Sequence, residues 1–270
     1  MRTIEIRPGV TIAYEDHWFG EPWVTPEAVV MIHGNSESST AWSQWVPHLS
    51  RYYRVVRPDL PGFGASPAPQ GYTWTATELA ADIGRFADAL KLERFHLIGA
   101  KYGGSACMRL ACDQPGRLIS LALFSGAVRG SGGGNAEAIR TKGVRQWAAD
   151  TMRSRLGSAA PMAQVKWWTD ELMGRADPRA AHGASAARID MELEHELHRI
   201  TAPTLYVTTE GSGLHSVEEV EKFARKIPNV RIIVMPGDSF HIAAVEPDQC
   251  ARHALRFMQE ISALRARAAE

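Results

Sequence analysis

Short hydrophobic runs alternate with segments of helical periodicity along most of the chain. The hydrophobic runs predict eight strands. These lie at Thr3–Arg7, Val10–Glu15, Ala28–His33, Tyr52–Arg57, Phe95–Gly99, Ser120–Phe124, Thr204–Thr209 and Arg231–Met235. The helical pattern is clearest at Thr77–Leu90, Gly103–Gln114, Val217–Lys226 and Pro247–Arg265. This alternation predicts an α/β fold, with a mainly parallel eight-stranded sheet and helices on both of its faces.

The strand rhythm is lost between Gly126 and Thr201. A Gly/Ser stretch opens this region, and segments rich in Trp, Met, Ala and Arg follow it. We expect an inserted helical cap, or lid, at residues 127–201 and a core domain made of residues 1–126 and 202–270. The opening glycines fit either the hinge of a lid or a loose surface loop. They are Gly130, Gly132, Gly133 and Gly134.

Composition excludes several classes of protein. The 270 residues include 30 Lys and Arg and 30 Asp and Glu, so no basic field favours nucleic acid as a partner. The three cysteines lack metal-binding spacing and fit buried thiols in a reducing compartment. The N-terminal segment is charged, and no run is apolar enough for a membrane span. We expect a cytoplasmic monomer or homodimer that acts on a small molecule.

Three segments follow predicted strands and so meet at the carboxyl edge of the sheet, where α/β folds place their sites. The first ends in His33-Gly34-Asn35, the second reads DLPGFGAS from Asp59 to Ser66, and the third is Gly99-Ala100-Lys101-Tyr102-Gly103. In this order and spacing the motifs resemble the α/β-hydrolase superfamily. The resemblance covers nearly the whole chain and implies a cap-bearing enzyme without a cofactor or a metal.

The resemblance places Lys101 at the nucleophile elbow, where the family carries a nucleophile between two flanking glycines. Acylation of a lysine would give an amide, so the usual acyl-enzyme route is not expected. A lysine can instead form a Schiff base, abstract a proton when neutral, or stabilise an oxyanion as a cation. The amino end of the following helix and a partly dry pocket should favour the neutral amine. Alternatively, Lys101 marks an inactive site or an engineered replacement of serine.

The resemblance also implies the other catalytic residues. His241, after the last predicted strand, matches the family's histidine and would act as general base and acid. Ser212 stands at the usual position of the acid, so Glu210 is the candidate to orient His241, with Asp238 as the weaker alternative. The backbone amides of Asn35 and Tyr102 would form the oxyanion hole.

Residues near the first motif and in the cap are candidates for the substrate pocket. His33 and Gly34 border the expected oxyanion hole, with His33 expected to brace its loop. Bulky cap residues could bind an apolar or aromatic compound or simply pack together, and a cap arginine could bind a carboxylate or lie in solvent. The candidates are Trp147, Trp167, Trp168, Arg145 and Arg140. His195 and His198 fit an exposed charged helix better than a metal site.

These features favour a cofactor-independent enzyme that acts on a small apolar or aromatic carbonyl compound. The reaction would be hydrolysis of an ester or lactone, or cleavage of a keto C–C bond in which Lys101 stabilises the carbanion. The alternative is a non-catalytic pseudo-hydrolase that serves as a small-molecule receptor, since such a protein would tolerate Lys101 and the missing acid.

Overall fold

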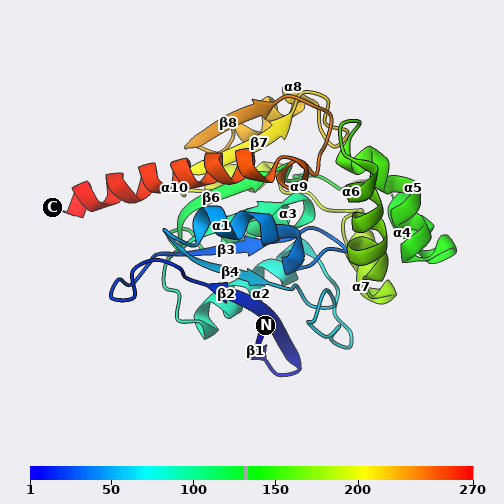
Figure 1. The fold of residues 1–270 in the computed structure, drawn as a ribbon, viewed down its shortest axis with the longest axis horizontal. Helices are drawn as coiled ribbons and strands as arrows, with labels where there is room; N and C mark the ends of the chain where they lie inside the picture. Colours follow the sequence, from blue (N-terminus) through cyan, green and yellow to red (C-terminus); the bar gives the residue numbers. More distant parts are fainter. Residues whose placement is uncertain (131–132, 270) are drawn as a thin grey trace.

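The computed structural model describes residues 1–130 and 133–269, so Gly132 of the expected hinge lies outside the described residues. Its centre is a sheet in the order β1-β2-β4-β3-β5-β6-β7-β8 (Figure 1). The strands are β1 (Arg2–Arg7), β2 (Val10–His17), β3 (Ala28–Ile32), β4 (Arg54–Pro58), β5 (Phe95–Ala100), β6 (Leu118–Phe124), β7 (Thr204–Thr209) and β8 (Val230–Met235). Pairing is parallel from β4 through β8, and β2 is antiparallel to both β1 and β4. The predicted mainly parallel sheet is confirmed.

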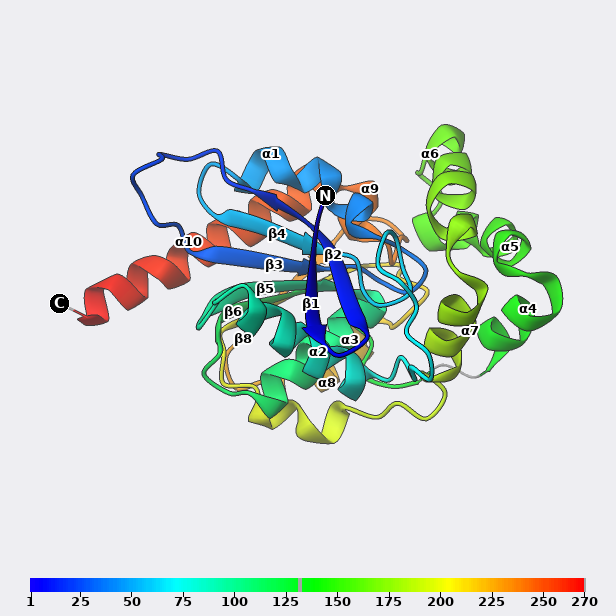
Figure 2. The same ribbon diagram turned by 90° about the horizontal axis from the view of Figure 1, so that it is seen from below.

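Helices cover both faces of the sheet, because alternate side chains of each strand point to opposite faces. Val30 and Ile32 of β3 join one hydrophobic cluster, whereas Val29 and Met31 join the other. Figure 2 shows the two helical layers on opposite sides of the strands. The first layer contains α2 (Ala76–Ala89), α3 (Lys101–Asp113) and α8 (Val217–Ala224). The second contains the 3-10 helix η1 (Ser39–Trp45), α1 (Val46–Leu49), α9 (Ile242–Val245) and α10 (Pro247–Ala269).

The segment between β6 and β7 is mainly helical and lies beside the carboxyl ends of the central strands (Figures 1 and 2). It contains α4 (Gly134–Lys142), α5 (Val144–Leu156), α6 (Met162–Trp167), the π-helix η2 (Trp168–Leu172), the 3-10 helix η3 (Met173–Arg175), α7 (Pro178–Ala186) and the 3-10 helix η4 (Glu194–Arg199). Buried residues from α4, α5, α6 and η2 form a hydrophobic cluster of their own. The bounds 127–201 for a cap domain remain a prediction.

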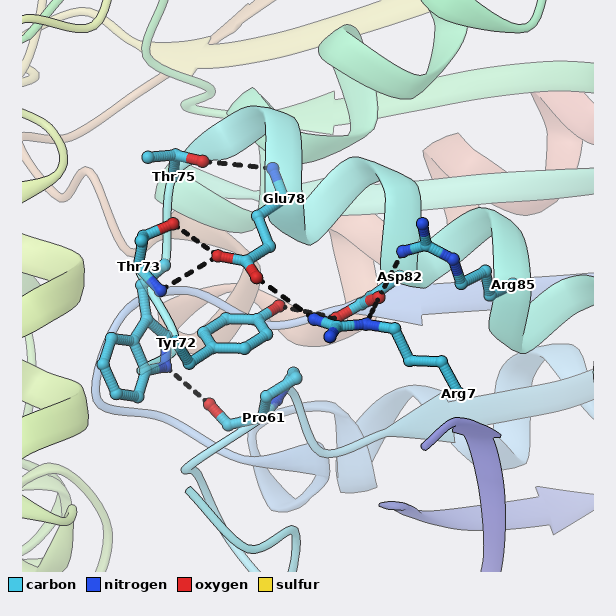
Figure 3. Close-up of polar contacts among 9 residues, drawn as sticks. Arg7, Pro61, Tyr72, Thr73, Thr75, Glu78, Asp82 and Arg85 are labelled. Carbon is cyan, nitrogen blue, oxygen red and sulfur yellow. Dashed lines mark hydrogen bonds and ion pairs between the residues drawn. The ribbon is translucent and has the colours of Figure 1, made fainter. Parts of the chain in front are cut away.

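A charged network fixes the antiparallel edge of the sheet to α2. The Arg7 side chain, at the end of β1, donates to the carboxylate of Asp82 at 2.9 Å and to that of Glu78 at 3.1 Å (Figure 3). The Tyr72 hydroxyl donates to the same Asp82 at 2.9 Å. Asp82 is almost fully buried, so these donors satisfy a carboxylate that would otherwise be costly to bury. This network therefore fixes α2 beside β1.

In the described part of the chain, no helix is both long enough and apolar enough to cross a bilayer.

Candidate active site

Lys101 occupies a sharp turn between β5 and α3. Its φ angle is +52°, in the left-handed region that residues other than glycine adopt at a cost. Close packing around the turn needs glycine on each side. A Cβ on Gly103 would lie 2.1 Å from the carbonyl oxygen of His33, and one on Gly99 would lie 2.6 Å from Sγ of Cys107. The strand, turn and helix expected around Lys101 are all present.

The amine of Lys101 lies between a carboxylate and an imidazole. Its Nζ is 2.7 Å from Oε1 of Glu37 and 3.4 Å from Nδ1 of His241. Nδ1 of His241 is in turn 3.6 Å from the same Glu37 oxygen. All three side chains are buried. We refer to Glu37, Lys101 and His241 as the buried triad.

Glu37 comes from the loop after β3 and was not among the residues predicted from the sequence. Its other oxygen, Oε2, accepts a hydrogen bond from the backbone N–H of Gly34 at 3.0 Å, which fixes the carboxylate. A Cβ on Gly34 would lie 2.7 Å from Cε of Lys101, so a side chain there would displace the lysine from its contact with Glu37. The sequence does show a glutamate three residues after the His-Gly turn. The resemblance to the family did not predict an acid at this position, so Glu37 was not considered.

His241 lies immediately before α9. Its backbone N–H donates to Oγ of Ser239 at 3.0 Å and to the carbonyl oxygen of Arg155 at 3.3 Å. The ring packs edge-on against Trp168 and Phe240, with centroids 5.3 and 5.0 Å away. Nε2 has no hydrogen-bond partner among the residues that the structure describes. An unpartnered buried polar atom costs free energy, which a hydrogen bond to a bound substrate or water molecule would offset.

Burial shifts the ionisation of both basic members of the buried triad. Loss of hydration lowers the pKa of Lys101, and Glu37 opposes that shift by favouring the cation. The pKa of His241 lies well below its ordinary value because of burial first, and then because of Lys101 and Arg155. At neutral pH, the imidazole of His241 is therefore neutral, and it lies next to the Lys101 amine, which contacts the carboxylate of Glu37. The lowering of the pKa of Lys101 agrees with the sequence argument, but the counteracting carboxylate was not foreseen.

The structure does not bring the expected acid to His241. Glu210 is exposed after β7, and the carboxylate near His241 is that of Glu37. Asp238, the alternative, accepts hydrogen bonds from the backbone N–H of Ser158. The prediction of Glu210 as the partner of His241 does not hold in this geometry, because the loop after β7 carries its side chain into solvent.

A cavity lies between the sheet edge and the inserted helices, next to the buried triad. The cavity is small, about 30 Å³, and it is partly open to solvent. The residues that line it come from both parts of the fold: Asn35, Glu37, Lys101, Tyr102, Ala127, Trp147, Arg155, Arg188, Leu214, Phe240 and His241. A lining that combines apolar side chains with a few polar groups is typical of small-molecule sites.

The two residues expected to supply an oxyanion hole both line this cavity. The backbone N–H of Tyr102 is in the first turn of α3, where a helix has no acceptor for it. The side-chain amide of Asn35 donates to Oγ of Ser185 at 2.9 Å, which connects this loop to α7. His33 is fully buried behind the loop, with Nε2 accepting from the N–H of Leu60 at 2.9 Å. It has the expected bracing contacts and is not among the residues that line the cavity.

The cap candidates fall into two groups. Trp147 lines the cavity, and the ring centroid of Trp168 is 5.6 Å from Nζ of Lys101. Trp167, which is 41% exposed, lines a separate surface hollow together with Trp168. Arg145 is exposed and pairs with Asp170, so its predicted place in the pocket is wrong for this structure.

The cavity is instead lined by Arg155 and Arg188, which were not among the residues predicted from the sequence. The exposed Arg140 pairs with Glu137 outside it. His195 and His198 are exposed. Within residues 1–130 and 133–269, no cluster of three His, Cys, Asp or Glu side chains is arranged to hold a metal ion.

Comparison with known proteins agrees with the fold described above. Residues 27–159 match the family model described as the alpha/beta hydrolase fold. A 2-hydroxy-6-oxo-2,4-heptadienoate hydrolase of Pseudomonas putida is 38% identical over 37% of this chain, and the match spans only 37% of that protein. A fluoroacetate dehalogenase of Burkholderia is 24% identical over 86% of this chain and 87% of that protein.

Solved structures extend the similarity to nearly the whole fold. The enol-lactonase of Burkholderia xenovorans LB400 superposes with a TM-score of 0.85 at 23% identity, covering 93% of this chain and 97% of that one. The eight-stranded sheet, the strained elbow and these matches define the class. The chain belongs to the α/β-hydrolase superfamily.

Proposed function

We propose that this protein is a cofactor-independent hydrolase that cleaves an ester or lactone bond in a small apolar or aromatic compound. The observation that carries the proposal is the buried triad beside a small cavity, with an unpartnered imidazole nitrogen and an amine together. Relatives whose names denote hydrolases of small molecules support the same class of reaction.

In the proposed reaction, Nε2 of His241 removes a proton from water as the water oxygen attacks the substrate carbonyl carbon. The backbone amides of Asn35 and Tyr102 donate to the oxyanion that forms. The imidazolium then donates the same Nε2 proton to the departing oxygen and the acyl–oxygen bond breaks, while the Lys101 cation, 3.4 Å from Nδ1 of the ring, stabilises the negative charge of the intermediate. One water is consumed, and no bond to the protein forms.

The contact with Glu37 favours this role over imine formation. An imine requires a neutral, nucleophilic amine, whereas a carboxylate at 2.7 Å favours the cation. A cationic lysine can instead donate a proton or stabilise negative charge in the transition state. Cleavage of a keto C–C bond through an imine is the second candidate reaction, because Lys101 occupies the nucleophile position itself.

A substrate panel with matched variants tests the proposal. We expect the wild type to hydrolyse at least one compound among enol lactones, aryl esters and vinylogous diketones. His241→Ala should lower kcat/KM for that compound by about 100-fold or more, since general base catalysis contributes at least this much. Glu210→Gln, an exposed change, should leave it unaltered. Equal losses of kcat/KM in His241→Ala and Glu210→Gln would contradict the placement of Glu37, rather than Glu210, in the site.

Reductive trapping separates the competing routes. Incubation with a ketone and borohydride, followed by mass spectrometry, would produce an adduct on Lys101 if an imine forms, and Lys101→Ala would abolish it. We expect no adduct with compounds that the enzyme hydrolyses. Tight binding of compounds without turnover of any of them would instead favour the receptor alternative.

A further inference from the structure

Two arginines from the inserted segment line the same cavity as the buried triad. Arg155 comes from α5, and Arg188 comes from the chain after α7. Both are mostly buried. Within the described residues, no carboxylate lies close enough to either guanidinium to form an ion pair. The contacts within the described part of the protein therefore do not neutralise these two buried charges.

The arginines are fixed by aromatic rings rather than by acids. The guanidinium carbon of Arg155 lies 4.6 Å from the centroid of Trp147, and its Nε donates to Oγ1 of Thr151 at 2.9 Å. The guanidinium carbon of Arg188 lies 5.6 Å from the centroid of Tyr102. Nε of Arg188 is buried and has no hydrogen-bond partner in the described part of the chain. Such stacking orients a planar guanidinium while leaving most of its N–H donors unused.

Other buried arginines have polar partners for their terminal nitrogens, although Nε of Arg57, like that of Arg188, has none among the described residues. Nη1 of Arg57 donates to the carbonyl oxygen of Ser39 at 2.9 Å and to Oγ of Ser43. Arg109 forms ion pairs with Asp113 and Glu196. A buried charged donor without an acceptor costs free energy. Within the described residues, the terminal nitrogens of Arg155 and Arg188 have no acceptor comparable to those of Arg57 and Arg109.

The charges around the cavity are also unbalanced. Lys101, Arg155 and Arg188 contribute three basic groups, and Glu37 is the one acid among the lining residues. Burial, and then the charge of Arg188, lowers the pKa of Arg155 to about 10. The same positive charge of Arg155 contributes to the low pKa values of Lys101 and His241. An anion in the cavity would relieve this repulsion.

We infer that the cavity binds the carboxylate of a small organic acid, with Arg188 and Arg155 as its binding residues. This inference rests on the proposed function, for which it identifies the substrate as a carbonyl compound that also bears a carboxylate. The guanidinium groups offer paired donors that match a carboxylate. Apolar side chains such as Leu214 and Phe240 suit the carbon skeleton of such an acid.

Binding of crotonate and of crotonamide to the wild-type protein tests the inference without any turnover. The two probes have the same four-carbon skeleton and differ in charge. By isothermal titration at constant ionic strength, we expect crotonate to bind at least about tenfold more tightly, as a charge-assisted pair contributes at least that much. Equal affinities would overturn the inference. Tighter binding of inorganic phosphate than of crotonate would overturn the assignment to a carboxylate.

Variants then locate the site. Arg188→Gln should remove most of the preference for crotonate, and Arg188→Lys should restore part of it. Arg145→Gln, which removes one exposed positive charge from the same segment, should leave the preference unchanged. An equal loss in Arg145→Gln and Arg188→Gln would show only a general charge effect and overturn the site. If circular dichroism shows that Arg188→Gln does not fold, the affinities of the wild type and of Arg188→Lys for crotonate and crotonamide test the site instead.

The result also separates this inference from the proposed function. A protein that prefers crotonate but hydrolyses nothing in the panel would refute the hydrolase and leave the carboxylate site in place. A protein that hydrolyses neutral esters and their carboxylate-bearing counterparts equally well would support the hydrolase and refute the carboxylate site.

Discussion

Replacing Glu37 with glutamine removes the charge from the buried triad while keeping the shape of the side chain. The glutamine oxygen can still accept the hydrogen bond from Gly34, which is 3.0 Å long in the wild type. The perturbation is therefore confined to the pair with Lys101. Since Glu37 favours the cation, we expect the pKa of Lys101 to fall further in Glu37→Gln.

The magnitude follows from the 2.7 Å separation between the charged atoms. At an effective dielectric constant of about 20, two unit charges at this distance attract by about 6 kcal/mol. Desolvation of the pair offsets much of this attraction, and the amine of the variant can lose its proton, so we expect a net loss of about 3 kcal/mol in the free energy of unfolding near neutral pH. The unfolded chains of the two proteins titrate alike, so the pH dependence of the loss comes from the folded states. The loss should shrink as the pH rises from the pKa of Lys101 in the folded variant to its less strongly lowered pKa in the folded wild type.

The ionisation of Lys101 can be followed directly by NMR. The chain has only six lysines, so 13C labelling at Cε gives few signals, and Lys101→Arg assigns the one of interest. Chemical denaturation at two pH values measures the free energy of unfolding. Glu171→Gln, which breaks an exposed pair with Arg175, is the control and should change neither quantity. An unchanged or higher pKa of Lys101 in Glu37→Gln would refute the coupling between the two residues.

Three further changes probe the same structure. Gly34→Ala places a Cβ 2.7 Å from Cε of Lys101, so we expect the free energy of unfolding to fall by about 1–3 kcal/mol and activity to fall with it. Gly134→Ala, with open space around it, should leave the free energy of unfolding unchanged. Equal losses of stability in the two variants, measured by thermal unfolding, would contradict the packing argument. Because the pKa of His241 lies well below its ordinary value, the base stays neutral in mild acid, and kcat/KM should not drop as the pH falls through about 6.5; half-loss there would contradict the burial effect. The pKa of Glu27 is lowered to about 2, first by its hydrogen bond with a histidine. Glu27→Gln should therefore lower the free energy of unfolding by about 1–2 kcal/mol at pH 7, after discounting for its partial exposure, and by less as the pH falls from about 4.5 towards 2. A loss that does not depend on pH in urea unfolding would exclude this linkage.

Most of the core sheet could be predicted from the sequence, because buried parallel strands leave continuous hydrophobic runs. The run predicted at Ala28–His33 is β3 (Ala28–Ile32), and the helix predicted at Val217–Lys226 is α8 (Val217–Ala224). The elbow at Lys101 could also be predicted, since the glycines around it are a local signal. These features depend on neighbours in the sequence.

The acid of the buried triad could not be predicted in the same way. Glu37 meets Lys101 because β3 and β5 are adjacent and parallel in the sheet, with Ile32 opposite Gly99. This contact is a property of the sheet order rather than of either segment alone. Glu210 has the expected position along the chain, but the chain position of a loop residue does not determine where its side chain points.

The cap arginines were missed for a related reason. The sequence marks Arg145 and Arg155 as residues of one helical region, yet only the packing of α5 against the core decides which faces the cavity. Arg145 pairs with Asp170 at the surface, whereas Arg155 stacks on Trp147 within. Arg188 lies outside any regular helix, so no periodicity indicated its direction.

The most direct measurement of the role of Lys101 is the steady-state rate of Lys101→Met on a compound that the wild type hydrolyses. Methionine keeps much of the apolar stem and lacks the amine. We expect kcat to fall by about 100-fold with KM little changed, as for loss of a group that acts in the transition state. A variant with the wild-type kcat would show that the amine takes no part in the reaction.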